Sequence, residues 1–328
     1  MSSFQAKLFS VSVGERRISA KRGFTLVEML VVIAIIGILV AMLFPALQAV
    51  RQSARKTKCS ANLRQVILAT LTFETSRQQF PAGDDGRGGG YVIPLLSHLK
   101  QEYLFEETER PLEDGETWRD RMIELAELEV EPLICPAASP VDDATTFEEL
   151  GDFTTHYHGI LGPIGEASTI DGERQYTYES LGGSEAEGGP IGLQGFYSPN
   201  ERGKFVGKKL RDIRDGTSYT FGFGEISGTD QSEDRVGIPR AGWSIGADYA
   251  SNGQPEKVYG LKSVVHTINF AGESELNATP FSSNHPQGAQ FALLDGAIRF
   301  VDQRVSLDVF KFHCSINAVE KPEDLDNF

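Results

Sequence analysis

Apolar residues dominate one stretch near the N-terminus. Residues 24–47 are FTLVEMLVVIAIIGILVAMLFPAL, and no polar side chain occurs from Met29 to Leu47. At 1.5 Å per residue, a helix of this length reaches about 30 Å, the thickness of the hydrocarbon core of a bilayer. The pattern predicts a transmembrane helix over residues 24–44, which Pro45 bends rather than ends.

A helical period continues beyond the transmembrane stretch. Apolar and small residues recur on one face, at Cys59, Leu63, Val66, Thr70 and Phe73, while polar residues including Asn62 fall on another face. We expect one long helix from about residue 24 to 77, with residues 45–80 forming an extension that packs on a sheet. The glycine-rich stretch 81–90, PAGDDGRGGG, ends the helix.

The remainder, residues 81–328, is predicted to be a soluble α+β domain. Helices are expected over 93–107 and 113–131, followed by a glycine-rich connection over 161–195. Strands are expected later in the chain, over 204–207, 218–227, 242–249 and 263–270. The clearest hairpin covers 289–301, with Asp295-Gly296 as a two-residue type I′ turn. The predicted fold is a long N-terminal helix packed on an antiparallel sheet.

The charge distribution restricts the partners of this domain. The chain carries a net charge of -15, and because its first 23 residues carry +4, the rest carries -19. An acidic domain repels phosphate backbones, so no nucleic-acid partner is expected. Basic residues flank the apolar stretch on both sides, so charge counting does not set its orientation in a membrane.

One acidic residue, Glu28, interrupts the membrane-length stretch. A carboxylate in a spanning helix costs about 2.5–3.5 kcal/mol, so it is expected to have a partner and a function. A secretory signal peptide cut near Ala49 is one interpretation, but the apolar run is long for such a peptide and contains this acid.

The segment 21–28, KRGFTLVE, resembles the leader junction of type IV prepilins. This resemblance implies that residues 1–23 are a cleaved leader, and that a prepilin peptidase cuts between Gly23 and Phe24 and methylates the new N-terminus. Glu28 then matches the acid at the fifth position of the mature family members. We expect its carboxylate to pair with the N-terminal amine of a neighbouring subunit, which relieves the cost of both charges in lipid.

A second resemblance lies near the C-terminus. His285 is followed by nine residues and then by Asp295-Gly296. With the prepilin junction, this resembles a family of prepilin-like proteins that carry a processing-associated His-x9-Asp-Gly domain of unknown function. The C-terminal tail departs from that family because it lacks a glycine-rich ending. His285 and Asp295 could bind a metal or pair with each other, but we favour structural roles, with Asp295 in the turn and His285 bonded to its loop.

No metal or cofactor site is predicted. His156 and His158 have a usable zinc spacing on one face of a strand, but no third ligand is evident nearby. Calcium remains open, although no ligands for it can be assigned. The chain shows no catalytic motif, so we do not expect an enzyme.

The three cysteines allow at most one disulfide within the chain. Cys135 and Cys314 are the candidate pair if the domain faces an oxidising compartment. Cys59 lies on the apolar face of the long helix and is expected to be packed rather than paired.

These observations predict a structural subunit of a type IV pilus-like or type II secretion-like pseudopilus. The expected partners are a prepilin peptidase, neighbouring pilin-like subunits and membrane lipid. The chain would cross the cytoplasmic membrane once, with its soluble domain in the periplasm or outside the cell. The alternative is a membrane-anchored binding or adhesion module that uses the prepilin leader only for sorting.

Overall fold

The computed structural model describes residues 25–84, 89–138, 155–166, 175–176, 178–179, 191–192, 207–227, 243–249, 255–272 and 279–316. The chain divides into two compact units, Met1–Val50 and Arg51–Phe328.

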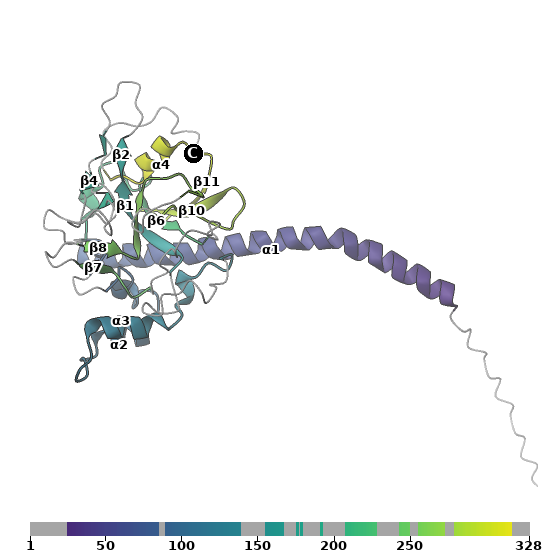
Figure 1. Ribbon diagram of the computed structural model, residues 1–328, viewed down its shortest axis with the longest axis horizontal. Helices are drawn as coiled ribbons and strands as arrows, with labels where there is room; N and C mark the ends of the chain where they lie inside the picture. Colours follow the sequence, from purple (N-terminus) through teal and green to yellow (C-terminus); the bar gives the residue numbers. More distant parts are fainter. Residues whose placement is uncertain are drawn as a thin grey trace, which may run out of the picture. The chain divides into compact units, whose positions relative to one another are not determined.

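The long helix predicted from the sequence is present as α1 (Leu26–Arg77), with Pro45 inside it (Figure 1). Among the described residues, α1 is the one helix that is long and apolar enough to cross a membrane. Its large apolar side chains from Leu26 to Val50 are exposed, as expected for residues whose solvent is lipid.

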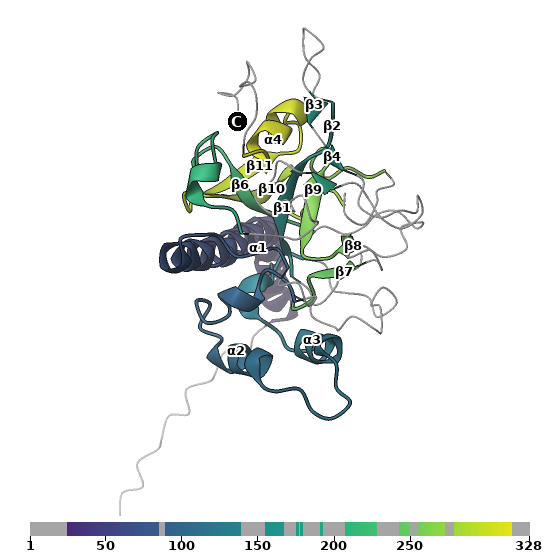
Figure 2. The ribbon, with the colours of Figure 1, turned by 90° about the vertical axis from the view of Figure 1, so that its left-hand side faces the viewer.

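The second part of α1 buries the face predicted from its period. Leu63, Val66 and Ile67 are fully buried in the same core as Phe223 and Leu294 of the sheet region. Burying such a side chain stabilises the fold by about 1.5–3 kcal/mol. Figure 2 shows the strands β6 (Phe221–Glu225) and β10 (Gly288–Leu293) on one side of this part of α1, and the helices α2 (Glu102–Glu109) and α3 (Trp118–Ala126) on the other.

The polar side chain of Asn62 is also buried, although the sequence pattern places it on the polar face. Its Nδ2 donates to the carbonyl oxygens of Glu131 (3.2 Å) and Ile134 (2.7 Å), so the loss of water is compensated at the nitrogen, whereas Oδ1 accepts no bond from the described residues.

The central sheet has five strands in the order β11-β10-β6-β1-β9. They are β1 (Tyr157–Pro163), β6 (Phe221–Glu225), β9 (Leu261–Val264), β10 (Gly288–Leu293) and β11 (Ile298–Asp302). The pair β1–β9 is parallel and the other pairs are antiparallel, so the sheet is mixed rather than purely antiparallel as predicted. The α+β layout with a long N-terminal helix is confirmed.

Short strands form three further pairs: β2 (Gly165–Glu166) with β3 (Gln175–Tyr176), β4 (Tyr178–Glu179) with β5 (Ile191–Gly192), and β7 (Ala247–Tyr249) with β8 (Pro255–Val258). Of the predicted strand 242–249, residues 243–249 are described, and residues 247–249 of these form β7. Of the predicted strand 263–270, residues 263–264 form the end of β9. Of the predicted strand 204–207, residues 204–206 lie outside the described residues.

Strand β1 was not predicted over its full length. Residues 161–163 belong to it, although the sequence predicts a flexible connection from 161 onward. All seven residues of β1 are buried, so the alternation of a half-exposed strand is missing. Its glycines further weaken the strand pattern, and the pairing with β9 shifts register between Ile160 and Gly162.

The predicted helix over 93–107 is interrupted. It consists of a 3₁₀ turn, η1 (Ile93–Leu95), and a separate helix, α2 (Glu102–Glu109), because the backbone at Lys100 adopts a φ of 61°. In the described part of the chain, the other helical elements are α3 (Trp118–Ala126), η2 (Glu131–Leu133), η4 (Leu210–Asp212) and α4 (Leu307–His313).

The predicted hairpin joins β10 to β11, but its turn differs from the prediction. A type I′ turn needs a positive φ at both central residues, and only Gly296 has one, at 89°. The N–H of Gly296 donates to Leu293 O, and the N–H of Leu293 donates to Ala297 O, which closes a three-residue loop. Asp295 Oδ1 accepts a bond from Ala297 N at 2.9 Å, so Asp295 does stabilise the turn.

The predicted disulfide is wrong. Cys135 bonds to Cys59, with their Cα atoms 4.8 Å apart, while Cys314 is a free, buried thiol. The bonds from Asn62 hold the segment after η2 against α1, which brings Cys135 to Cys59. Cys314 lies in a second core with Phe291, on the opposite face of the sheet from the disulfide.

Removing the disulfide should destabilise the Arg51–Phe328 unit. We expect Cys135→Ser to lower the free energy of unfolding by about 2–5 kcal/mol, because the bond closes a loop between residues 76 positions apart. Denaturant titration in the presence of a chelator measures this. Reductant should lower the stability of the native chain to that of Cys135→Ser and leave the variant unchanged; a native chain insensitive to reductant would contradict the pairing.

A buried ion pair should make the α2–α3 region sensitive to acid. Arg121 is buried, and its Nε and Nη2 donate to Glu116 at 2.5 Å each, which lowers the pKa of Glu116 to about 2. The unfolded state therefore binds a proton at higher pH than the folded state, so this stabilisation is present above pH 4.5 and is lost as the pH falls toward 2.

We expect Glu116→Gln to lower the unfolding midpoint at pH 7, because it leaves the guanidinium buried without its counter-charge. The difference from the native chain should shrink between pH 4.5 and 2, as followed by circular dichroism. A difference that stays constant with pH would show that the ion pair does not act in this way.

Candidate functional site

The processing junction is described only in part. Gly23 and Phe24 lie outside the described residues, whereas Glu28 occupies the first turn of α1. Thr25 precedes the helix, and its backbone N and Oγ1 donate to Glu28 Oε2 at 2.8 and 2.9 Å. In return, the backbone N of Glu28 donates to Thr25 Oγ1 at 3.2 Å.

This reciprocal pattern is a capping box, in which the two side chains satisfy N–H groups that the start of a helix leaves without partners. The Thr25-x-x-Glu28 spacing is the sequence signal for it, and our sequence analysis did not use that signal. Glu28 therefore caps the N-terminus of α1, the helix to which it belongs, in addition to any role of its charge.

The residues of the His-x9-Asp-Gly motif do not contact one another as a pair. His285 precedes β10 and Asp295 follows it, so the two lie at opposite ends of a six-residue strand, roughly 20 Å long. Asp295 is engaged in its turn. The nine-residue spacing is thus the length of β10 with its flanking residues.

Both ends of the motif meet α1. At one end, His285 Nε2 lies 3.7 Å from the sulfur of Cys135, which is bonded to Cys59 of α1. At the other end, Gly296 lies under α1, where an added Cβ would come within 3.4 Å of Leu71. Residues 59 and 71 are about 18 Å apart along a helix axis, which is close to the length of β10. The two ends of the motif, His285 and Gly296, therefore pack β10 alongside α1.

A buried polar cluster surrounds the disulfide. Glu225, at the end of β6, is fully buried, and its Oε1 lies 3.0 Å from Cys135 Sγ and 3.4 Å from His285 Nε2. Ser227 Oγ donates to Oε1 at 2.5 Å, and Gln290 N donates to Oε2 at 3.1 Å. These bonds hold the carboxyl group in one orientation.

Burial controls the protonation of this cluster. It raises the pKa of Glu225 to about 7, against the opposing effect of the bonds from Ser227 and Gln290. Burial also lowers the pKa of His285, so both groups favour their neutral forms. A disulfide sulfur carries no proton, so the close contact between Cys135 and Glu225 is best satisfied by a protonated carboxyl.

Sequence reasoning missed two members of this cluster, Cys59 and Glu225. The signal for Glu225 is an acid that directly follows the apolar strand residues FGFG, and Cys59 was interpreted as a packing residue.

His156 and His158 are buried, and His156 Nδ1 accepts a bond from Cys135 N at 2.9 Å. Within the described part of the chain, these two histidines join no group of three metal-type ligands.

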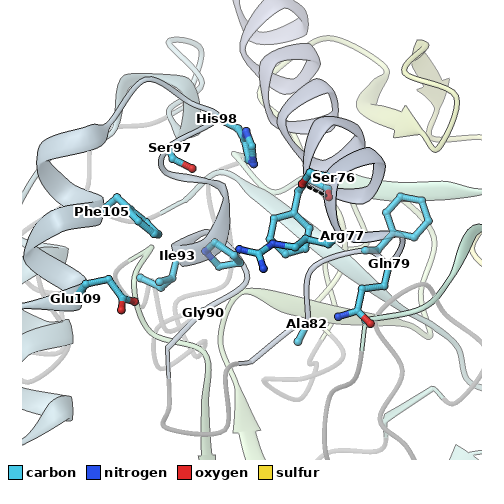
Figure 3. Close-up of a pocket in the computed structure, with 14 residues that line it drawn as sticks. Ser76, Arg77, Gln79, Ala82, Gly90, Ile93, Ser97, His98, Phe105 and Glu109 are labelled. Carbon is cyan, nitrogen blue, oxygen red and sulfur yellow. Dashed lines mark hydrogen bonds between the residues drawn. The ribbon is translucent and has the colours of Figure 1, made fainter.

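A cavity of about 730 Å³ lies near the end of α1 (Figure 3). Its lining combines apolar side chains with the charged residues Arg77 and Glu109, which come from α1 and α2. Figure 3 shows the guanidinium of Arg77 extending toward Ile93. Among the described residues, neither Glu28 nor any residue of the His-x9-Asp-Gly motif lines this cavity.

Comparisons with known proteins agree with both resemblances. Residues 18–44 match the prokaryotic N-terminal methylation motif, and residues 48–308 match a family described as "Protein of unknown function (DUF1559)". The type II secretion system core protein G of Escherichia coli (strain K12) is 30% identical over 88 residues. That alignment covers 27% of this chain and 61% of the relative's length. No solved structure matches significantly.

The methylation motif coincides with the leader junction and the start of α1, and the larger match covers most of the remaining chain. The protein is therefore a prepilin-like member of the DUF1559 family.

Proposed function

We propose that this chain is a structural subunit of a type IV pilus-like or type II secretion-like pseudopilus, matured by a prepilin peptidase. The observation that carries the proposal is the methylation motif placed directly at the start of an exposed apolar helix. The likeness to a secretion-system core protein supports the same class of assembly.

The geometry at the start of α1 explains how cleavage would prepare the chain for assembly. Cutting between Gly23 and Phe24 leaves one residue before Thr25, so the new amine lies beside the positive end of the helix dipole. An amine there is costly in lipid unless an anion compensates it. The carboxylate of Glu28 from a neighbouring subunit is that anion, and the pairing sets the register between subunits.

The proposed location is the cytoplasmic membrane, crossed once by the apolar part of α1, with the Arg51–Phe328 unit on the outer side. The Cys59–Cys135 disulfide supports this orientation, because disulfides persist in oxidising compartments outside the cytoplasm. Lipid and neighbouring pilin-like subunits are the proposed partners of α1.

The proposed role is structural rather than enzymatic. The reaction at Gly23–Phe24 is carried out on this chain by the peptidase, and assembly requires no catalytic group or cofactor of the chain itself. The second candidate is a membrane-anchored binding module, which is favoured by the open cavity lined by Arg77 and Glu109.

Blocking the junction should stop maturation. We expect Gly23→Leu to leave a full-length, unmethylated precursor, because a bulky residue replaces the glycine that the peptidase must accommodate. Intact mass and N-terminal sequencing measure this. Ala20→Leu, three residues upstream, is the control and should be processed normally. A mature N-terminus near residue 50 would instead identify a secretory signal peptide.

Two substitutions at Glu28 separate its charge from its capping role. Glutamine retains a side-chain oxygen that can accept from Thr25 but carries no charge, whereas alanine removes both functions. We expect Glu28→Gln and Glu28→Ala both to reduce fibre or pseudopilus assembly to background, as measured by shearing and immunoblotting of surface material. Both should remain in the membrane fraction.

The outcomes distinguish the two candidate functions. Normal assembly with Glu28→Gln but not with Glu28→Ala would mean that capping alone matters and that no intersubunit ion pair exists. A native chain found only as membrane-bound monomers, with both variants behaving identically to it, would favour the binding module.

A further inference from the structure

We propose that Cys59, Cys135, Glu225 and His285 form a zinc site when the disulfide is reduced. The four residues come from four segments that are distant in the sequence: α1, the loop after η2, the end of β6 and the loop before β10. Their potential ligand atoms all lie within 4.8 Å of one another, and all four side chains are buried. Two thiolates, an imidazole and a carboxylate form a donor set suited to Zn²⁺.

Among three of the four ligand atoms, two of the three separations already match tetrahedral spacing. In a tetrahedral zinc site with bonds of about 2.0–2.3 Å, ligand atoms are about 3.3–3.8 Å apart. Here the separation from His285 Nε2 to Glu225 Oε1 is 3.4 Å, and that from His285 Nε2 to Cys135 Sγ is 3.7 Å. Cys135 Sγ and Glu225 Oε1 are 3.0 Å apart, somewhat closer than such a site requires.

The fourth ligand requires the disulfide to open. A dithiol reductant would donate two electrons and two protons to the Cys59–Cys135 bond and become a disulfide itself, leaving two thiols. Zn²⁺ then displaces those two protons and the proton of the Glu225 carboxyl group, all three of which pass to solvent, and binds the two thiolates and the carboxylate. The sulfurs must separate to about 3.8 Å, so the proposal requires the Cys59 side chain to rotate after reduction. The disulfide and the zinc site are mutually exclusive because both need both sulfurs.

The surroundings would orient the ligands and balance their charge. Ser227 Oγ and Gln290 N already hold the Glu225 carboxyl group, as outer-shell bonds do in metal sites. With two thiolates and one carboxylate, bound Zn²⁺ leaves one net negative charge. Lys56 is electrostatically coupled to Glu225 and supplies a compensating positive charge.

The zinc site would fasten more of the fold than the disulfide does. The disulfide joins two segments, whereas the metal would join α1 to three segments, including the motif residue His285. This gives the histidine of the motif a role that its hydrogen bonding alone does not provide. In the reduced chain, the bound zinc would hold the four segments together. In the oxidised chain, the disulfide holds Cys59 and Cys135 together.

Metal analysis of the full chain in detergent tests the proposal. The protein is reduced with a phosphine, exposed to zinc chloride, passed over a desalting column and analysed by mass spectrometry of the metal. We expect about one zinc per reduced chain and almost none per oxidised chain. Cobalt in place of zinc should give the thiolate charge-transfer absorption and the intense visible bands of a tetrahedral site.

Single-ligand variants establish which residues bind. His285→Gln and Glu225→Gln should lose most of the zinc in the reduced state and still form the disulfide when oxidised, which shows that they fold. Cys314→Ala is the matched control, since Cys314 lies in the other core, and it should retain about one zinc.

A reduced native chain without stoichiometric zinc would overturn the proposal, as would His285→Gln and Glu225→Gln chains that both bind as much zinc as the native chain. The cluster would then serve the disulfide alone. Neither result affects the proposed function, which depends on Gly23 and Glu28.

Discussion

The packing of one face of α1 against β6 and β10 is the interaction on which the rest of the Arg51–Phe328 unit depends. Up to Val50 the helix exposes apolar side chains all around, and from Cys59 onward it buries a stripe. Gly222 allows the close approach, because an added Cβ there would collide with Leu294 and touch Ile67. One continuous helix thus has two environments. The change from apolar side chains exposed on all sides to a single buried face marks where the domain begins.

The C-terminal motif is best understood as part of this packing. His285 and Gly296 contact the region of α1 at the two ends of β10, so their spacing follows from the length of a strand. In this sense the motif belongs to the architecture of the domain, while Glu28 and the leader junction belong to the proposed maturation and assembly. The two signatures are at opposite ends of the chain, and α1 connects their roles.

Elements with strong local patterns could be predicted from the sequence, and those that depend on distant partners could not. The period along α1, the apolar strand before Glu225 and the β10–β11 hairpin each carry their own signal. Strand β1 does not, because it is buried throughout and rich in glycine. The pairing of Cys59 with Cys135 depends on two bonds from Asn62 to the segment around η2, and residue spacing contains no information about those contacts.

The position of the disulfide has a mechanical consequence. Cys59 is the first residue of α1 that is buried. Just before it, the carbonyl oxygen of Lys56 accepts a bond from Gln290 of β10, so a pull on the N-terminal part of the helix reaches the domain at Lys56 and Cys59. Hydrogen bonds and apolar contacts yield one at a time when a helix is peeled from a surface, but a covalent bond does not. If the subunit is drawn out of a membrane by its helix, as the proposed function implies, the disulfide would still transmit the force to the loop after η2 once the bond between Lys56 and Gln290 of β10 had broken.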